Sequence, residues 1–108
     1  MSKESIKRQI EGYKRDIDRQ KSSIALCRED MAKIRIRKSR DAETYSRRLT
    51  TANSTAQKHS IRAQKKRDWD RYSRDLQRER DKISKCREKS KDYREDIKRC
   101  RERIKRLK

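Results

Sequence analysis

The chain has 108 residues, of which 51% are charged and 28% are apolar, with one Trp and no Phe. This composition excludes an ordinary globular core, because too little apolar surface is available to build one. The formal net charge of +19 predicts attraction to polyanions such as nucleic acid, an anionic membrane or an acidic protein. The chain contains no Pro, so very long helices are permitted.

The first half of the chain carries a heptad pattern that predicts a helix over about residues 3–48. Its seam positions are separated by alternating steps of four and three residues, as the a and d positions of a coiled coil are. In order, these positions are Ile6, Ile10, Tyr13, Ile17, Gln20, Ile24, Cys27, Met31, Ile34, Lys38, Asp41 and Tyr45. A pattern of this length favours a helix over the disorder that composition alone would suggest.

A charge-free stretch, residues 49–57, follows this helix and predicts a turn near residues 49–60. It is rich in Thr, Ser and Asn, whose side chains bond to nearby backbone groups and favour turns and helix caps. Asn53, Ser54 and Thr55 are each suited to cap a second helix.

The second half predicts another helix, over about residues 58–107, with the same alternation of steps. Its seam positions are Trp69, Tyr72, Leu76, Glu79, Ile83, Cys86, Ser90, Tyr93, Ile97, Cys100, Ile104 and Leu107. If the chain folds back near Thr55, seam residues whose numbers sum to 110 lie opposite each other, as Ile6 and Ile104 do. We therefore predict an all-α fold, with residues 1–108 forming a single antiparallel two-helix coiled-coil hairpin. Because this seam is narrow, a homodimer or docking on a partner helix would add burial.

Positive charge is concentrated around the predicted turn, where residues 32–67 hold twelve basic and two acidic side chains. Ile36, Leu49 and Ile61 lie outside the seam positions in this part of the chain, and Ile36 should be exposed. Basic residues interleaved with aromatic residues suit a phosphate backbone with stacked bases, whereas Trp69 and Tyr72 also fit as plain seam residues. The proposed nucleic-acid contacts are Lys33, Arg35, Arg37, Arg40, Lys58, Arg62, Lys66 and Arg67.

Catalytic patterns are missing from the sequence. The one histidine, His59, is best explained as a surface residue, and we expect no enzymatic activity and no cofactor. Cys27, Cys86 and Cys100 form no C-x-x-C pair, so we expect reduced cysteines that act as small apolar residues and no metal site. The N-terminus lacks the apolar stretch of a signal peptide and no segment is apolar enough to span a bilayer, so we expect a cytoplasmic protein.

Three functions fit these features. The first is a hairpin that binds DNA or RNA through sequence-independent phosphate contacts at its basic end. In shape it resembles the tRNA-contacting arm of seryl-tRNA synthetases. The second is an adaptor or chaperone that docks on an acidic helical protein. In size and architecture the chain is similar to the small helical hairpins that accompany type VII secretion toxins, but it lacks a W-x-G motif, since Asp70 and Arg71 follow Trp69. Membrane-surface binding is the least favoured, because the apolar stripe is narrow.

Overall fold

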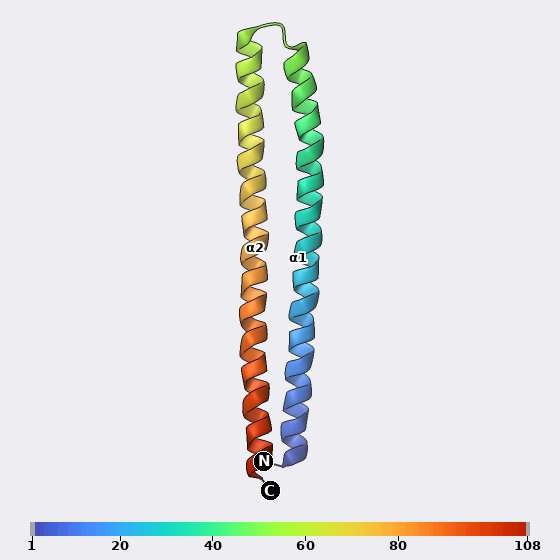
Figure 1. The fold of residues 1–108 in the computed structure, drawn as a ribbon, viewed down its shortest axis with the longest axis vertical. Coiled ribbons are helices and arrows are strands. Elements are labelled where there is room, and N and C mark those ends of the chain that lie inside the picture. Colours follow the sequence, from blue (N-terminus) through green and yellow to red (C-terminus); the bar gives the residue numbers. More distant parts are fainter. Residues whose placement is uncertain (1, 108) are drawn as a thin grey trace. The chain divides into compact units, whose positions relative to one another are not determined.

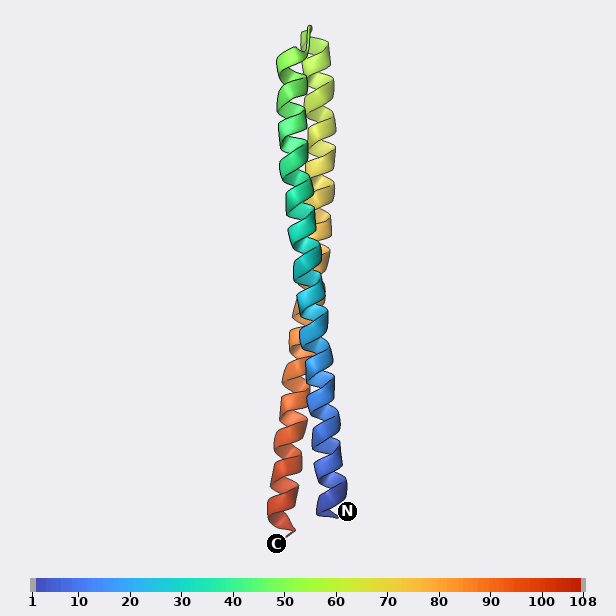
Figure 2. The same ribbon diagram turned by 90° about the vertical axis from the view of Figure 1, so that its right-hand side faces the viewer.

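The computed structural model describes residues 2–107 and contains two α-helices, α1 (Lys3–Thr51) and α2 (Thr55–Arg106). The helices run antiparallel and lie side by side, joined at one end by a short connection (Figures 1 and 2). No strand is present within residues 2–107. The prediction of an all-α two-helix hairpin is confirmed.

Hydroxyl side chains define where both helices begin. The Ser2 hydroxyl accepts a hydrogen bond from the Ser5 backbone N–H (3.2 Å), and the Ser54 hydroxyl accepts one from the Gln57 N–H (3.1 Å). Each serine therefore caps a helix whose first N–H groups have no partner within the helix. In the second cap the Gln57 side chain also accepts a hydrogen bond from the Asn53 N–H (2.7 Å). The connection and the first turn of α2 are therefore joined by hydrogen bonds in both directions.

The turn is shorter than the predicted stretch 49–57, because only residues 52–54 lie outside the helices. At the end of α1, the hydroxyls of Thr50 and Thr51 donate to the carbonyls of Ser46 and Arg47 four residues earlier. These bonds are compatible with helical backbone, so the threonines extend α1 instead of breaking it. Capping at Ser54 likewise places Thr55–Gln57 inside α2.

The contacts between the helices divide the chain into two units, which we describe separately. The open-end unit contains the described residues up to Cys27 and from Asp81 onwards, and the turn unit contains Arg28–Arg80. One hydrophobic cluster of the open-end unit consists of the eight members of four predicted opposite pairs: Ile6 and Ile104, Ile10 and Cys100, Tyr13 and Ile97, and Ile17 and Tyr93. The predicted pairing therefore places the correct residues together in this unit.

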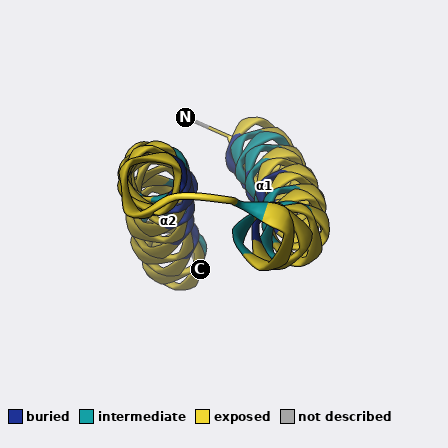
Figure 3. Cartoon of the chain, turned by 90° about the horizontal axis from the view of Figure 1, so that it is seen from above, coloured by how far each residue is buried: buried dark blue, intermediate teal, exposed yellow. Residues whose placement is uncertain are grey.

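Burial follows the predicted seam closely, and it is confined to the sides on which the two helices face each other (Figure 3). Every predicted seam residue of α1 and of α2 is buried or half-buried, and the predicted seam residue Leu107, which follows α2, is exposed. The seam also contains two buried polar residues, Glu79 and Ser90. Gln20, the predicted partner of Ser90, is half-buried.

Near the turn, the placement of Ile61 and Leu49 outside the seam was wrong. Ile61 is buried and Leu49 is half-buried, whereas Arg48 and Arg62 at the strict heptad positions are exposed. The seam shifts by one residue because an ideal helix has 3.6 residues per turn and drifts away from a 3.5-residue repeat. The exposure of Ile36 was predicted correctly (54% exposed).

Candidate nucleic-acid interface

The turn unit is held together by two reciprocal hydrogen bonds between tyrosine and aspartate, which we call the Tyr–Asp clasp. The Tyr45 hydroxyl of α1 donates to Asp68 of α2, and the Tyr72 hydroxyl of α2 donates to Asp41 of α1. Both tyrosines are buried, and both aspartates are half-buried at the edge of the seam. Hydrogen bonds to a charged acceptor are stronger than neutral ones, so the clasp closes a section of seam that has few aliphatic residues.

The three aromatic side chains of this unit form one cluster. Trp69 contacts Tyr45 and Tyr72 in edge-to-face arrangements, with ring centroids 6.0 and 5.9 Å apart. The ammonium groups of Lys38 and Lys65 lie 5.5 and 5.3 Å from the centroid of the Trp69 ring. Pairing seam residues whose numbers sum to 110 sets Lys38 opposite Tyr72 and Asp41 opposite Trp69, a poor match that predicts either a binding surface or a loosely closed end. The loosely closed end is wrong, because these residues contact one another across the seam. Tyr45 and Tyr72 are core residues and have no free ring face on which a base could stack.

The clasp makes stability sensitive to alkaline pH. Burial and the hydrogen bond to Asp68 raise the pKa of Tyr45 to about 12, and burial and the bond to Asp41 raise the pKa of Tyr72. A tyrosine in the unfolded chain ionises near about pH 10, so the stabilisation is complete below that pH and is lost as the pH rises towards the folded-state pKa.

We therefore expect the stability advantage of the native protein over Tyr45→Phe to shrink between about pH 9 and pH 12. Phe has no ionisable group, and all lysines are common to the two proteins, so their titration cancels in the difference. Urea unfolding of both proteins across this range measures it. A difference that does not change with pH would contradict the raised pKa.

The clasp results from an internal repeat that the heptad analysis missed. Residues 34–49 and 61–76 are identical at nine of sixteen positions, in the pattern I-R-x-x-K-x-R-D-x-[DE]-x-Y-S-R-x-L. The repeats lie antiparallel, one on each helix, so the Asp of each copy meets the Tyr of the other. A self-comparison of the sequence would have shown the repeat, and with it the pairing of these four residues.

All eight predicted contact residues are exposed, as a binding surface requires. With 3.6 residues per turn, however, they do not form one surface. Arg35, Lys58, Arg62 and Lys66 share one side of the turn unit, and Lys33 and Arg37 lie on the opposite side. Arg40 and Arg67 lie on the outer sides of α1 and α2.

The section of the turn unit nearest the connection contains no acidic residue. Residues 44–67 hold seven Lys or Arg and no Asp or Glu. Further from the connection, residues 68–78 lie alongside α1 and bring Asp68, Asp70 and Asp75 together with three arginines. The section without acidic residues is therefore confined to the end of the hairpin, and it is shorter than the sequence window of residues 32–67.

Cys27 and Cys100 are buried and Cys86 is half-buried, and no disulfide bond joins any two of these described cysteines. Among the described residues, no three His, Cys, Asp or Glu side chains are grouped closely enough to hold a metal ion. Within residues 2–107, neither helix is long and apolar enough to cross a membrane.

Comparison of the chain with protein families, with characterised proteins and with solved structures finds no match.

Proposed function

We propose that this protein is a non-enzymatic basic hairpin that binds nucleic acid through sequence-independent contacts with phosphates. The observation that supports this most directly is the section of residues 44–67, which carries seven basic side chains and no acidic one. Six of these seven are exposed on helices, which makes them accessible to a phosphate backbone. Phosphate contacts of this kind need positive charge without any specific pocket, which agrees with a seam filled by the chain's own side chains.

The test is binding of a labelled DNA duplex of about 20 base pairs, followed by fluorescence anisotropy at several salt concentrations. The test variant replaces all eight predicted contact residues with Gln. The control replaces eight exposed basic residues of the open-end unit with Gln: Lys85, Arg87, Lys89, Lys91, Arg94, Lys98, Arg101 and Arg103. Each variant loses eight positive charges, so both have a formal net charge of +11 instead of +19.

We expect the log–log salt slope of the test variant to fall by about 0.9 for every phosphate contact that is lost. The control should keep most of the slope, although its net charge is the same. Equal losses in both variants would show that binding is not localised at the turn unit. A native protein that does not bind the duplex at low salt would refute the proposal.

Ile36 supports a second candidate, an adaptor or chaperone that docks on an acidic helical protein. This side chain is 54% exposed and lies on the outer side of α1, where Ala32 and Ser39 are its neighbours one turn away. An exposed isoleucine between small residues suits contact with another helix, and the surrounding arginines suit an acidic one. Co-purification of a helical partner that is lost in Ile36→Gln and kept in Ile36→Val would favour this function over nucleic-acid binding.

A further inference from the structure

The turn unit has two broad sides that differ sharply in charge. Both Lys38 of α1 and Lys65 of α2 lie near the ring of Trp69, so these three residues mark one side, which we call the indole face. On the other side, Arg48 of α1 donates a hydrogen bond to Gln64 of α2 (3.1 Å). We call that side the aspartate face, because its helical positions include the two aspartates of the clasp. The helical repeat then assigns the remaining residues of the unit to one face or the other.

The indole face carries eight basic residues and no acidic residue. They are Arg28, Arg35, Lys38, Lys58, Arg62, Lys65, Lys66 and Arg80. Six of them are exposed, and the two lysines beside Trp69 are half-buried. The other positions on this face include Trp69 and small or hydroxyl residues such as Ser39, Ser46 and Ser73. Nothing on this face would repel an anion.

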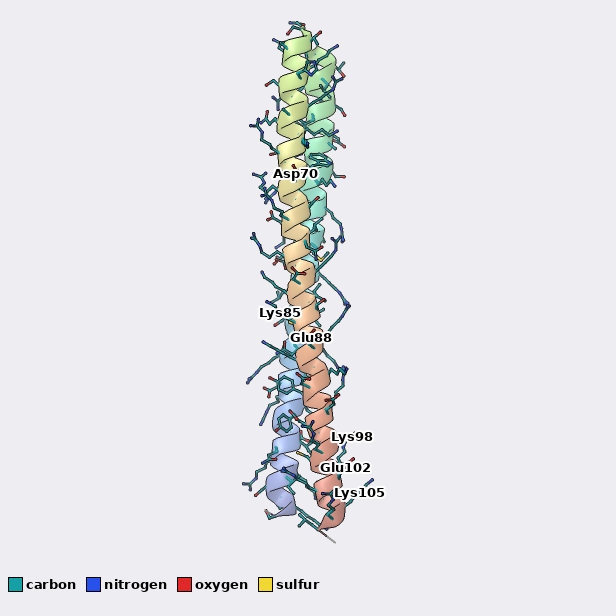
Figure 4. The ribbon with its side chains drawn as sticks, turned by 90° about the vertical axis from the view of Figure 1, so that its left-hand side faces the viewer. Asp70, Lys85, Glu88, Lys98, Glu102 and Lys105 are labelled. Atoms are coloured by element: carbon teal, nitrogen blue, oxygen red, sulfur yellow. The ribbon has the colours of Figure 1, made fainter. Side chains whose placement is uncertain are left out.

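The aspartate face carries five basic residues, Lys33, Arg37, Arg48, Arg71 and Arg78, together with four aspartates, Asp30, Asp41, Asp68 and Asp75. Its positive charge is partly neutralised, since Arg71 forms an ion pair with Asp68 (3.7 Å). The remaining acidic residues of the unit lie elsewhere: Asp70, for example, is on the outer side of α2, which faces the viewer in Figure 4. The electrostatic contrast between the two faces therefore comes from four aspartates against none, and from five basic residues against eight.

Two positive charges beside one indole also strengthen the local attraction of an anion. The ammonium groups of Lys38 and Lys65 lie 5.5 and 5.3 Å from the same ring centroid, and half-burial reduces the screening of their charges by water. Both charges are therefore available to attract a phosphate to this side of the turn unit. Repetition contributes as well, because Arg35 and Lys38 in the first repeat match Arg62 and Lys65 in the second.

The aromatic residues indicate which form of nucleic acid this face would accept. Proteins that bind single strands use exposed rings on which bases stack. Among the described residues every aromatic side chain is buried or half-buried, and Trp69 has lysines near its ring. A duplex keeps its bases stacked internally and presents about one phosphate charge per 1.7 Å, which matches a face with charge but no free ring.

We infer that the indole face is the surface on which the turn unit binds the phosphate backbone of a nucleic-acid duplex, while the aspartate face remains free of ligand. This assignment rests on the proposed function and narrows it to one side of the hairpin. It predicts that basic residues of equal exposure contribute unequally, according to the face on which they lie.

The test compares two triple variants by duplex binding over a range of salt concentrations. Arg35→Gln, Arg62→Gln and Lys66→Gln alter the indole face, and Lys33→Gln, Arg37→Gln and Arg78→Gln alter the aspartate face. All six side chains are exposed, and none of these described side chains takes part in a hydrogen bond or ion pair. Both variants should therefore fold, which far-ultraviolet circular dichroism checks, and both carry a formal net charge of +16 after losing three charges from +19.

We expect the indole-face variant to bind roughly tenfold or more weakly, with a salt slope reduced by about 2 to 3, and the aspartate-face variant to change its slope by less than about 1. Trp69 provides a second readout, since duplex binding should protect its fluorescence from iodide quenching in the native and aspartate-face proteins. An unlabelled single strand should compete less well than the duplex.

Equal losses in the two variants would overturn the face assignment and leave the proposed function standing. A stronger loss in the aspartate-face variant would place the ligand on the opposite side. Stronger competition by the single strand would overturn the duplex assignment. If the native protein fails to bind either form, the proposed function itself is refuted.

Discussion

Replacing Tyr72 with Ala should lower the free energy of unfolding of the turn unit by about 3 to 5 kcal/mol. Tyr72 is 2% exposed, contacts the Trp69 ring and donates a hydrogen bond to Asp41. Removing the ring leaves a cavity in a section of seam that has few aliphatic side chains, and it leaves a half-buried carboxylate without its donor. Both effects act at the same layer of the hairpin, so the loss is large for a two-helix structure.

Trp69 fluorescence during urea unfolding measures this loss locally, because Trp69 is the only tryptophan and contacts Tyr72 directly. Tyr72→Phe is the matched control: it keeps the ring and removes only the hydroxyl, at an expected cost of about 1 to 2 kcal/mol. If the Ala variant unfolds at the same urea concentration as the native protein, Tyr72 does not have the packing role assigned to it. Equal costs for Ala and Phe would attribute the effect to the hydrogen bond alone.

Replacing Ile97 with Ala should destabilise the open-end unit by about 2 to 5 kcal/mol. Ile97 is 6% exposed and packs in the cluster that contains Ile17 and Cys100. The half-buried rings of Tyr13 and Tyr93, whose centroids are 6.1 Å apart, pack against the same cluster. The seam consists of a single stripe of side chains on each helix, so few neighbouring side chains can shift to fill the cavity.

The buried thiol of Cys100 reports on this unit, since it is 4% exposed and reacts with a thiol reagent only when the seam opens. In Ile97→Ala, modification of Cys100 should be faster by a factor that corresponds to the loss of stability. Lys98→Ala removes the exposed neighbouring side chain and should leave the rate nearly unchanged. A similar acceleration in both variants would mean that the cluster around Ile97 does not hold the unit closed.

The architecture could be predicted from the sequence because a coiled-coil seam is a one-dimensional pattern. Steps of four and three residues place side chains on one stripe of a helix whatever that helix packs against. The eight-residue cluster of the open-end unit followed from pairing the two stripes around one turn. The length of the turn was harder to predict, because Thr, Ser and Asn serve equally well as turn residues and as helix-terminal residues that bond to the backbone.

The polar part of the seam could not be predicted from heptad positions alone. In the turn unit, Lys38 and Asp41 appeared to be poor partners for Tyr72 and Trp69 when only directly opposite residues were compared. Long side chains reach neighbouring layers, so Asp41 accepts from Tyr72, and Lys38 lies near the Trp69 ring. Those contacts hold the two helices together in a section of seam that has few aliphatic residues.

The candidate interface, too, could be predicted from the sequence only in part. Exposure of the eight predicted contact residues follows from their positions off the seam, and all eight are exposed. Their division among the two faces and the outer sides of the helices depends on the rotation of each helix about its own axis, which is set by the seam that both helices share. The same rotation places four aspartates on one face and none on the other.

By itself, the sequence of this protein determined two long helices, their antiparallel pairing and a large excess of positive charge, since each depends on periodicity or on composition. Only the tertiary structure decided that Ile61 joins the core, that the tyrosines are tied to aspartates, and that one side of the turn unit is free of acidic residues. The physical reason is that these features depend on how one helix is rotated against the other. That rotation is set by packing between residues far apart in the chain.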